Sequence, residues 1–348
     1  HRIFAPIGVV YDVLIGSFEI LAGLVLVAVS TFWIRRNIIK LKRFFNPDLK
    51  GFPKSDANYI LYFEMVLMTL FLLMNASDLH LQNVPGGFPH FIKAGSFPIS
   101  QFIAPVFNGM SNELVMMLNE GFWWLHIVGI LVFMNYLYFS KHLHILLAFP
   151  NTYFANLNPQ GQFENLASVT AEVKLMMDPN ADPFAAAPVS ENETPSKFGA
   201  SDIQDLNWVQ LLNAYTCTEC GRCTSSCPAN QTGKMLSPRK IMMDTRDRME
   251  EVGRNIDANK GVFIPDNKSL LNDYITPEEL WACTSCNACV EECPVNISPL
   301  SIIMDMRRYL VMEQSAAPMP LNAMMTNIEN NGAPWQYSQQ DRLNWKND

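Results

Sequence analysis

The cysteines are the residues of this sequence whose spacing most directly implies chemistry. All eight fall in two short runs, Cys217, Cys220, Cys223 and Cys227, then Cys283, Cys286, Cys289 and Cys293. Each run reads C-x2-C-x2-C-x3-C-P. Thiolates bind soft and borderline metals, and such tight clustering excludes a disulfide framework spread along the chain. The pattern therefore predicts metal centres held by thiolates.

The two runs resemble those of two-cluster ferredoxins, in which the fourth cysteine of each run ligates the other cluster. Three thiolates at this pitch can surround three irons of a cubane, and the chain then turns at the proline. The resemblance implies a first [4Fe–4S] cluster on Cys217, Cys220, Cys223 and Cys293. It implies a second on Cys283, Cys286, Cys289 and Cys227. A pair of zinc sites is the alternative, but zinc usually takes two C-x2-C pairs, so we expect iron–sulfur clusters.

The helices expected around these runs are also repeated. The sequence S-P-x-x-I-x-M-D-x-R occurs at 237–246 and again at 298–307, and each copy starts as a helix does, with Ser at the N-cap and Pro next. Thr276 and Glu279 form a capping box before a third helix. Residues 206–318 resemble the helical ferredoxin domain of heterodisulfide reductase, glycerol-3-phosphate dehydrogenase and succinate dehydrogenase iron–sulfur subunits. We interpret the repeated helix as packing around the clusters.

The composition indicates that the first part of the chain, residues 1–150, enters a membrane. The 348 residues are 49% hydrophobic and 17% charged, and three stretches, 7–34, 59–76 and 122–140, are long enough to cross a bilayer. Such stretches are rare among the buried helices of soluble proteins. The net charge of −8 argues against a nucleic-acid partner. We predict an all-α fold, with a transmembrane helix bundle over 1–150 followed by a cytoplasmic helical dicluster ferredoxin domain.

The basic residues predict the orientation of these spans. Residues 35–57 hold seven, Arg35, Arg36, Lys40, Lys42, Arg43, Lys50 and Lys54. The loop 78–121 holds only Lys93. Loops rich in Lys and Arg stay on the cytoplasmic side, so everything after about 150 is predicted to be cytoplasmic, in a multi-pass protein of the inner membrane. The apolar segment 91–118 is expected to lie on the opposite membrane surface as short amphipathic helices.

Two histidines are candidate haem ligands. His126 and His144 are 18 residues apart, so on one continuous helix they share a face about 27 Å apart, and His142 faces elsewhere. This spacing suits stacked b-type haems, whose iron accepts imidazole. The alternative is a hydrogen-bonded or interfacial role, above all for His144 beside Lys141.

The spans and their histidines resemble the last three of five helices in the cytochrome b subunit of respiratory nitrate reductase, and the membrane subunits of heterodisulfide reductase. The resemblance implies that two helices, carrying the opposing haem ligands, precede residue 1. The chain begins with His1 rather than Met, in keeping with that expectation.

The segments on either side of the ferredoxin domain differ from it in composition. Residues 151–205 are rich in Asn, Pro, Ala and Ser, which predicts a largely extended linker with one short helix near 171–177. In the tail 319–348, residues 327–335 read N-x-E-x-x-G-x-P-W. This resembles the stretch that precedes a cysteine-rich CCG domain in fused heterodisulfide-reductase-like proteins, and implies a docking site for a CCG-type subunit. A plain disordered tail is the alternative.

Together these features predict a membrane-bound electron-transfer subunit, an oxidoreductase that is active only with partner subunits. It would relay electrons between a CCG-type subunit or electron-transfer flavoprotein and membrane quinone, menaquinone or ubiquinone, through haem b. One alternative is a quinol-oxidising subunit of a heterodisulfide- or sulfur-reducing complex, and another is a non-catalytic membrane anchor with structural clusters. No Walker or Rossmann glycine pattern predicts a nucleotide site, and no catalytic side chain is assigned.

Overall fold

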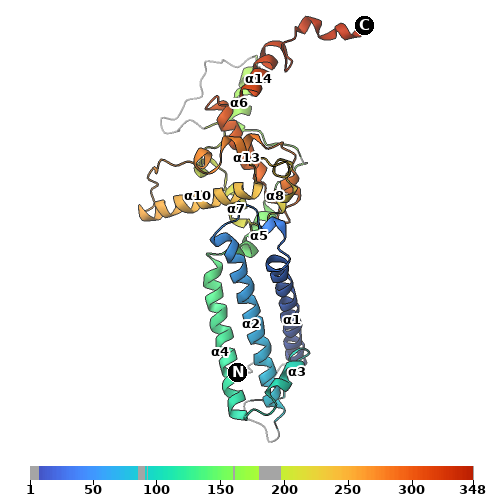
Figure 1. The fold of residues 1–348 in the computed structure, drawn as a ribbon. Helices are drawn as coiled ribbons and strands as arrows, with labels where there is room; N and C mark the ends of the chain where they lie inside the picture. Colours follow the sequence, from blue (N-terminus) through green and yellow to red (C-terminus); the bar gives the residue numbers. More distant parts are fainter. Residues whose placement is uncertain (1–7, 85–90, 92, 160, 180–196, 348) are drawn as a thin grey trace. The chain divides into compact units, whose positions relative to one another are not determined.

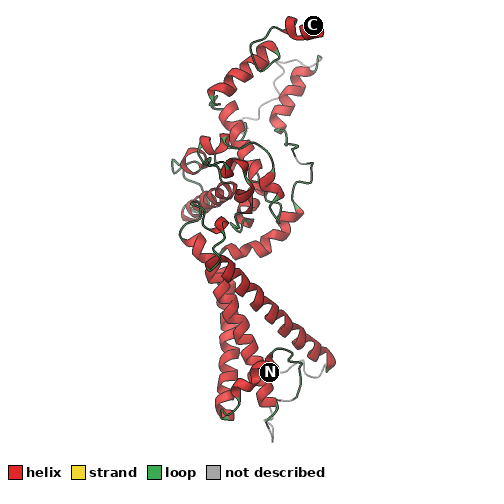
Figure 2. Ribbon diagram, turned by 45° about the vertical axis from the view of Figure 1, so that its right-hand side comes forward, coloured by secondary structure: helices red, strands yellow, loops and turns green. Residues whose placement is uncertain are grey.

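The computed structural model describes residues 8–84, 91, 93–159, 161–179 and 197–347 (Figure 1). Within these ranges every regular element is a helix, and the only β-type pairing is an isolated bridge between Leu271 and Ile275 (Figure 2). The all-α prediction is therefore confirmed for the described residues. The chain divides into two compact units: unit 1 is 1–147 with 218–221, and unit 2 is 148–217 with 222–348.

Unit 1 is built on three long apolar helices, α1 (Val9–Asn37), α2 (Phe52–Gln82) and α4 (Asn112–Leu137). Each is longer than the roughly 20 residues that a bilayer needs, and their most apolar windows have mean hydropathies of 2.3, 1.7 and 1.5. Helix α2 packs against both α1 and α4 (Figure 1). The three spans expected from the sequence are thus confirmed as helices that are long and apolar enough to cross a membrane.

Two carboxylates of α1 accept hydrogen bonds from α2 and from the backbone that follows it. Glu19 is fully buried and accepts hydrogen bonds from Asn75 Nδ2 (3.0 Å) and from the backbone N–H groups of Ile99 (3.0 Å) and Ser100 (3.1 Å). Asp12 accepts from Gly95 N at 2.6 Å. These bonds hold the backbone that leads into α3 (Ser100–Ile103) against α1, and the turn η3 (Ala104–Phe107) that follows packs against α2. Part of the segment 91–118, which was expected on the membrane surface, is therefore packed onto α1.

The third span ends sooner than the sequence predicts. Helix α4 stops at Leu137, a short 3₁₀ turn η4 (Lys141–Leu143) follows, and α5 (His144–Tyr153) begins anew. Ser140 is extended and its hydroxyl accepts from His142 N at 3.1 Å, while Asp56 accepts from Lys141 N at 2.9 Å. Both bonds replace helical hydrogen bonds, so the expectation of one continuous helix from 126 to 144 is wrong.

Unit 2 is a set of shorter helices: α6 (Ala167–Met177), α7 (Trp208–Thr216), α8 (Arg222–Ser226), α9 (Pro228–Gln231), α10 (Pro238–Ala258), α11 (Pro277–Trp281), α12 (Ala288–Glu291), α13 (Pro299–Met312) and α14 (Met319–Asn331). Shorter turns are η2 (Lys42–Phe44, in unit 1), η5 (Ile203–Asp205), η6 (Leu270–Tyr274, irregular) and η7 (Gln339–Lys346). The expected N-caps of α10 and α13, Ser237 and Ser298, accept from the N–H three residues on, and Thr276 forms the expected capping box. The helix expected near 171–177 is α6.

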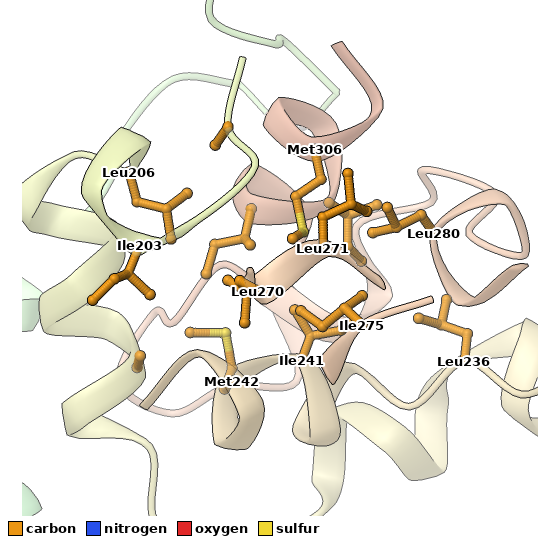
Figure 3. Packing of buried hydrophobic residues seen from close by; sticks show 14 of the residues in the cluster. Ile203, Leu206, Leu236, Ile241, Met242, Leu270, Leu271, Ile275, Leu280 and Met306 are labelled. Carbon is orange, nitrogen blue, oxygen red and sulfur yellow. The ribbon is translucent and has the colours of Figure 1, made fainter. Parts of the chain in front are cut away.

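A single apolar core joins the repeated helices of unit 2 (Figure 3). Ile241 of α10 and Ile302 of α13 occupy the same position in the sequence repeat, and both side chains are fully buried. Leu270 and Ile275 of the irregular turn pack in the same core. Burial of such side chains is the main favourable contribution to folding, so the repeat acts here as two packing faces around one core.

Arg248 of α10 ties this core to two loops. Its side chain is fully buried and donates to Asp202 (Nη2–Oδ2 2.8 Å), Asp266 (Nη1–Oδ2 2.5 Å) and the carbonyl of Lys268 (2.8 Å). The hydrogen bonds from Arg248 lower the pKa of Asp266 to about 2. Because this pKa is below that of an unfolded Asp, the pair stabilises the fold above about pH 4 and is lost as the pH falls toward 2.

We expect Arg248→Met to destabilise unit 2 by about 3 kcal/mol, because two carboxylates lose their buried partner. Amide hydrogen exchange across 238–258 should then accelerate on the order of 100-fold at neutral pH. Arg254→Met is the matched control, since Arg254 lies on the same helix, is mostly exposed and pairs with Glu250 only at 3.7 Å. Equal exchange in the two variants would contradict the role given to Arg248.

Candidate iron–sulfur site

A small cavity in unit 2 is bordered by cysteines of both runs. Its lining includes Cys227, Cys283, Cys286 and Cys289, with apolar side chains of Leu236, Pro238, Leu300 and Ile303. These four cysteines are the set that the sequence predicts for the second cluster, and Cys227 comes from the first run. No three His, Cys, Asp or Glu side chains in the described residues converge on a single ion. A [4Fe–4S] cluster takes four thiolates, so the four cysteines around this cavity are the donor set that such a cluster needs.

Short helices bring the two runs together. Cys227 is the N-cap of α9, with Pro228 at its first position, so the chain turns at this cysteine as the motif predicts. Helix α8, which carries Cys223, packs against α12, which carries Cys289. Thr224 on α8 accepts from Arg239 N at 3.2 Å, which fixes the first run against the start of α10.

The backbone of the two runs is duplicated as closely as their cysteines. The third and fifth residues of each run are left-handed: Glu219 (φ 58°) and Gly221 (φ 74°), then Ser285 (φ 57°) and Asn287 (φ 61°). Alternation of this kind turns successive N–H groups toward one side, which favours bound anions. In the second run Ser285 N donates to Cys283 Sγ at 3.4 Å. Sequence reasoning missed this feature, although Gly221 and Asn287 are residue types that adopt positive φ readily.

Burial shapes the chemistry of the second set. It raises the pKa of Cys289 to about 12, with a further contribution from neighbouring thiols, and it raises the pKa of Cys283. Hydrogen bonding from Ser285 and the positive charge of Arg307 oppose the shift at Cys283. The cavity therefore favours thiolates only when a cation or metal centre compensates their charge.

The first set is divided between the two units. Cys217, Cys223 and Cys293 belong to unit 2, and Cys220 belongs to the segment 218–221 that groups with unit 1. Within unit 1, Glu219 of that segment accepts from Lys141 Nζ at 2.6 Å, and both side chains are buried. The ligand set of the first cluster stays a prediction.

The structure separates the two candidate haem ligands onto different helices. His126 lies on α4 with Nδ1 3.0 Å from the carbonyl of Leu67, whereas His144 starts α5 with Nδ1 2.8 Å from the carbonyl of Lys141. The expected orientation of His142 is also wrong, because its ring centroid is 5.9 Å from that of His144. Because the two rings lie on different helices, their 18-residue spacing does not place them on one face, and haem ligation stays a prediction.

The C-terminal tail contains one helix with no buried side chain, α14. Gly332 ends it in the left-handed conformation (φ 64°), and Asn327 Nδ2 donates to the carbonyl of Pro334 at 3.3 Å. The N-x-E-x-x-G-x-P-W stretch is therefore a helix end folded back on itself. Trp335, the last residue of this stretch, and Trp345 further along the chain are largely exposed.

Comparison with known proteins places the cluster runs in a recognised domain. Residues 216–297 match the family model of a 4Fe-4S dicluster domain. The expectation of a two-cluster iron–sulfur domain is thereby supported by similarity.

Three curated relatives show how far the likeness extends. The probable iron-sulfur-binding oxidoreductase FadF of Bacillus subtilis is 30% identical over 98% of this chain and 47% of its own length. The EtfAB:quinone oxidoreductase of Syntrophomonas wolfei is 30% identical over 71% of this chain and 34% of its own length. A polypeptide of the ferredoxin/F(420)H(2)-dependent CoB-CoM heterodisulfide reductase of Methanosarcina acetivorans is 32% identical over 34% of this chain and 60% of its own length.

The likeness to FadF extends across both units, and this chain spans about half the length of that relative. No solved structure matches the chain. The expected resemblance to iron–sulfur oxidoreductases and heterodisulfide reductase is supported by these relatives. The resemblance of the membrane part to the nitrate reductase cytochrome b subunit stays a prediction.

We expect anaerobically purified protein to hold about eight irons per chain, in two [4Fe–4S] clusters. Cys227→Ser should disturb the EPR signal of the second cluster and Cys293→Ser that of the first, because each is assigned across the runs. Ser226→Ala, next to Cys227, should leave both signals unchanged. Stoichiometric zinc, or four irons or fewer in an intact sample, would refute the assignment.

Proposed function

We propose that this chain is a membrane-bound iron–sulfur electron-transfer subunit that links a cytoplasmic redox partner to the membrane quinone pool. The observation that carries the proposal is the cavity bordered by Cys227, Cys283, Cys286 and Cys289 in a chain with three span-length helices. A soluble ferredoxin has no need of such helices, and a plain membrane anchor has no need of such a cavity.

The described residues have distinct tasks in this function. A bound [4Fe–4S] cluster supplies a one-electron carrier whose potential depends on charge, hydrogen bonds and exposure. The four cysteines would hold it, and the apolar side chains of Leu300 and Ile303 limit the access of water to the same cavity. Ser285 N–H, donating to Cys283 Sγ, removes electron density from one ligand.

The relatives support quinone and flavoprotein as the two ends of the relay. The name EtfAB:quinone oxidoreductase describes a protein that acts between an electron-transfer flavoprotein and quinone, and its likeness covers 71% of this chain. We therefore propose an electron-transfer flavoprotein or a CCG-type subunit as donor, and menaquinone or ubiquinone as acceptor. A second candidate is a quinol-oxidising subunit that reduces a disulfide or sulfur acceptor. The likeness to the heterodisulfide reductase polypeptide supports this candidate.

The distribution of basic residues supports a cytoplasmic position for the cluster domain. Seven Lys and Arg lie in 35–57, between α1 and α2, against one in 78–121. We place this loop, and the chain after α4, on the cytoplasmic side of the inner membrane. The exposed tail from α14 onward is then available to a CCG-type partner in the cytoplasm.

Haem b remains the proposed carrier within the membrane, with His126 and His144 as its ligands. Each ring has Nδ1 at a backbone carbonyl, which leaves Nε2 without a hydrogen-bond partner among the described residues. This is the usual arrangement of a metal-bound imidazole, whose second nitrogen is held by a carbonyl or carboxylate. The same bonds would also hold a purely structural histidine.

The relay itself is tested with full-length protein in liposomes. Dithionite-reduced protein should be reoxidised on addition of a menaquinone analogue, with the decay of the cluster EPR signals as readout. Cys289→Ser, which removes a ligand of the second cluster, should slow this reaction at least tenfold. If quinone leaves the reduced signals unchanged in parent protein with intact clusters, the anchor hypothesis is favoured instead.

The haem assignment has its own test. A reduced-minus-oxidised spectrum of full-length protein should show a b-type band that His144→Ala and His126→Ala each weaken, since each removes an axial imidazole. His80→Ala is the control, because His80 lies at the end of α2 and is not an expected ligand. Absence of the band, or its persistence in both variants, would show that the haem assignment is wrong.

A further inference from the structure

Arg307 of α13 is hydrogen-bonded to the segment that leads into the second cysteine run. Its Nε and Nη2 atoms donate to the carbonyl of Leu280 at 3.0 and 2.6 Å, and Nη2 also donates to the carbonyl of Cys283. The guanidinium carbon lies 4.9 Å from the centroid of the Trp281 ring. The side chain is therefore held by three residues that directly precede or include a predicted cluster ligand.

The charge of Arg307 has no acidic partner in the part of the chain that the structure describes. The neighbouring Arg308 pairs with Asp305 at 2.7 Å, and Arg248 is paired with two carboxylates. Arg307 has only carbonyl groups and an aromatic face, although it is partly buried. Taking a cation even partly out of water without a counter-ion is costly, so a negative charge nearby would stabilise Arg307. Cys283, whose carbonyl accepts from Nη2 of Arg307, is a predicted ligand of the second cluster and so brings such a charge close to the guanidinium.

We propose that the positive charge of Arg307 compensates the negative charge of the second cluster. Arg307 would thereby stabilise the reduced form of this cluster and raise its reduction potential. The inference rests on the proposed cluster assignment and goes beyond it, because it concerns a residue outside the cysteine motif. A cluster on four thiolates is anionic and gains one more negative charge on reduction. A cation fixed on the carbonyl of Cys283, a residue that lines the cavity, stabilises the reduced form of the cluster more than the oxidised form.

The internal repeat predicts that this effect is confined to one cluster. Arg246 occupies the position in α10 that Arg307 occupies in α13, but its Nη2 lies 3.8 Å from the carboxylate of Asp247. A neighbouring carboxylate offsets the charge of Arg246, whereas Arg307 keeps its full charge. The two halves of the domain thus differ in electrostatics although their helices share one sequence pattern.

The test is a redox titration of full-length protein followed by EPR, which reports the two cluster couples separately. Arg307→Gln should shift the second couple, the one disturbed by Cys227→Ser, to more negative potential and leave the first in place. Arg307→Lys should keep most of the parent potential, because it retains the charge. Arg308→Gln is the matched control: it removes the same charge one residue away, where Asp305 already balances it, and should shift neither couple.

A second variant tests the proposal without removing Arg307. Val311 lies one helical turn after Arg307 and is partly buried, so Val311→Glu offers the guanidinium a carboxylate at i+4. It should also shift the second couple to more negative potential, whereas Val311→Gln should not. This variant decides the matter if Arg307→Gln loses its second cluster.

Some outcomes would overturn the role of Arg307. One is an unchanged potential of the second couple in both Arg307→Gln and Val311→Glu. The other is a negative shift of that potential in Arg307→Lys as large as the shift in Arg307→Gln. Failure of the cluster assignment is distinguishable, because the parent protein would then lack two [4Fe–4S] couples and about eight irons.

Discussion

The organisation of unit 2 depends on one constraint: four cysteines from both runs line a single cavity beside its apolar core. Buried thiolates repel one another, and burial raises the pKa of Cys289 to about 12, so their convergence is favourable only around a compensating centre. Meeting this constraint calls for two half-domains packed face to face. The paired helices α10 and α13, with Ile241 and Ile302 at equivalent buried positions, provide that packing.

The two units stabilise buried charge in different ways. In unit 1 the buried carboxylate of Glu19 accepts hydrogen bonds from three N–H donors, with no cation among its hydrogen-bond partners in the described residues. In unit 2 the buried guanidinium of Arg248 is held by two carboxylates. Arg307 follows neither pattern, since carbonyl groups accept from its Nε and Nη2 atoms and no carboxylate in the described residues pairs with its charge. That difference is the reason to connect Arg307 with the anionic cluster.

The prediction that His126 and His144 share one helix failed because hydropathy does not locate the end of α4. The apolar run from Phe122 onward predicts a helix, and α4 is indeed helical as far as Leu137. Its end is set by Ser140 and by Asp56, a residue on α2 some eighty positions earlier. The contact with Asp56 is tertiary, and no pattern near residue 140 shows it. Helix periodicity therefore could not relate His126 to His144.

By itself, the sequence determined the features that rest on local pattern: three apolar spans, the helix starts at Ser237, Thr276 and Ser298, and two cysteine runs of ferredoxin type. Each depends on residues close together in the chain, where backbone geometry and polarity act directly. Only the tertiary structure decided which distant groups meet. It placed the backbone before α3 on Glu19, Asp56 on the turn after α4, and Arg307 on the segment ending at Cys283. These contacts arise from packing between helices, which no local pattern encodes.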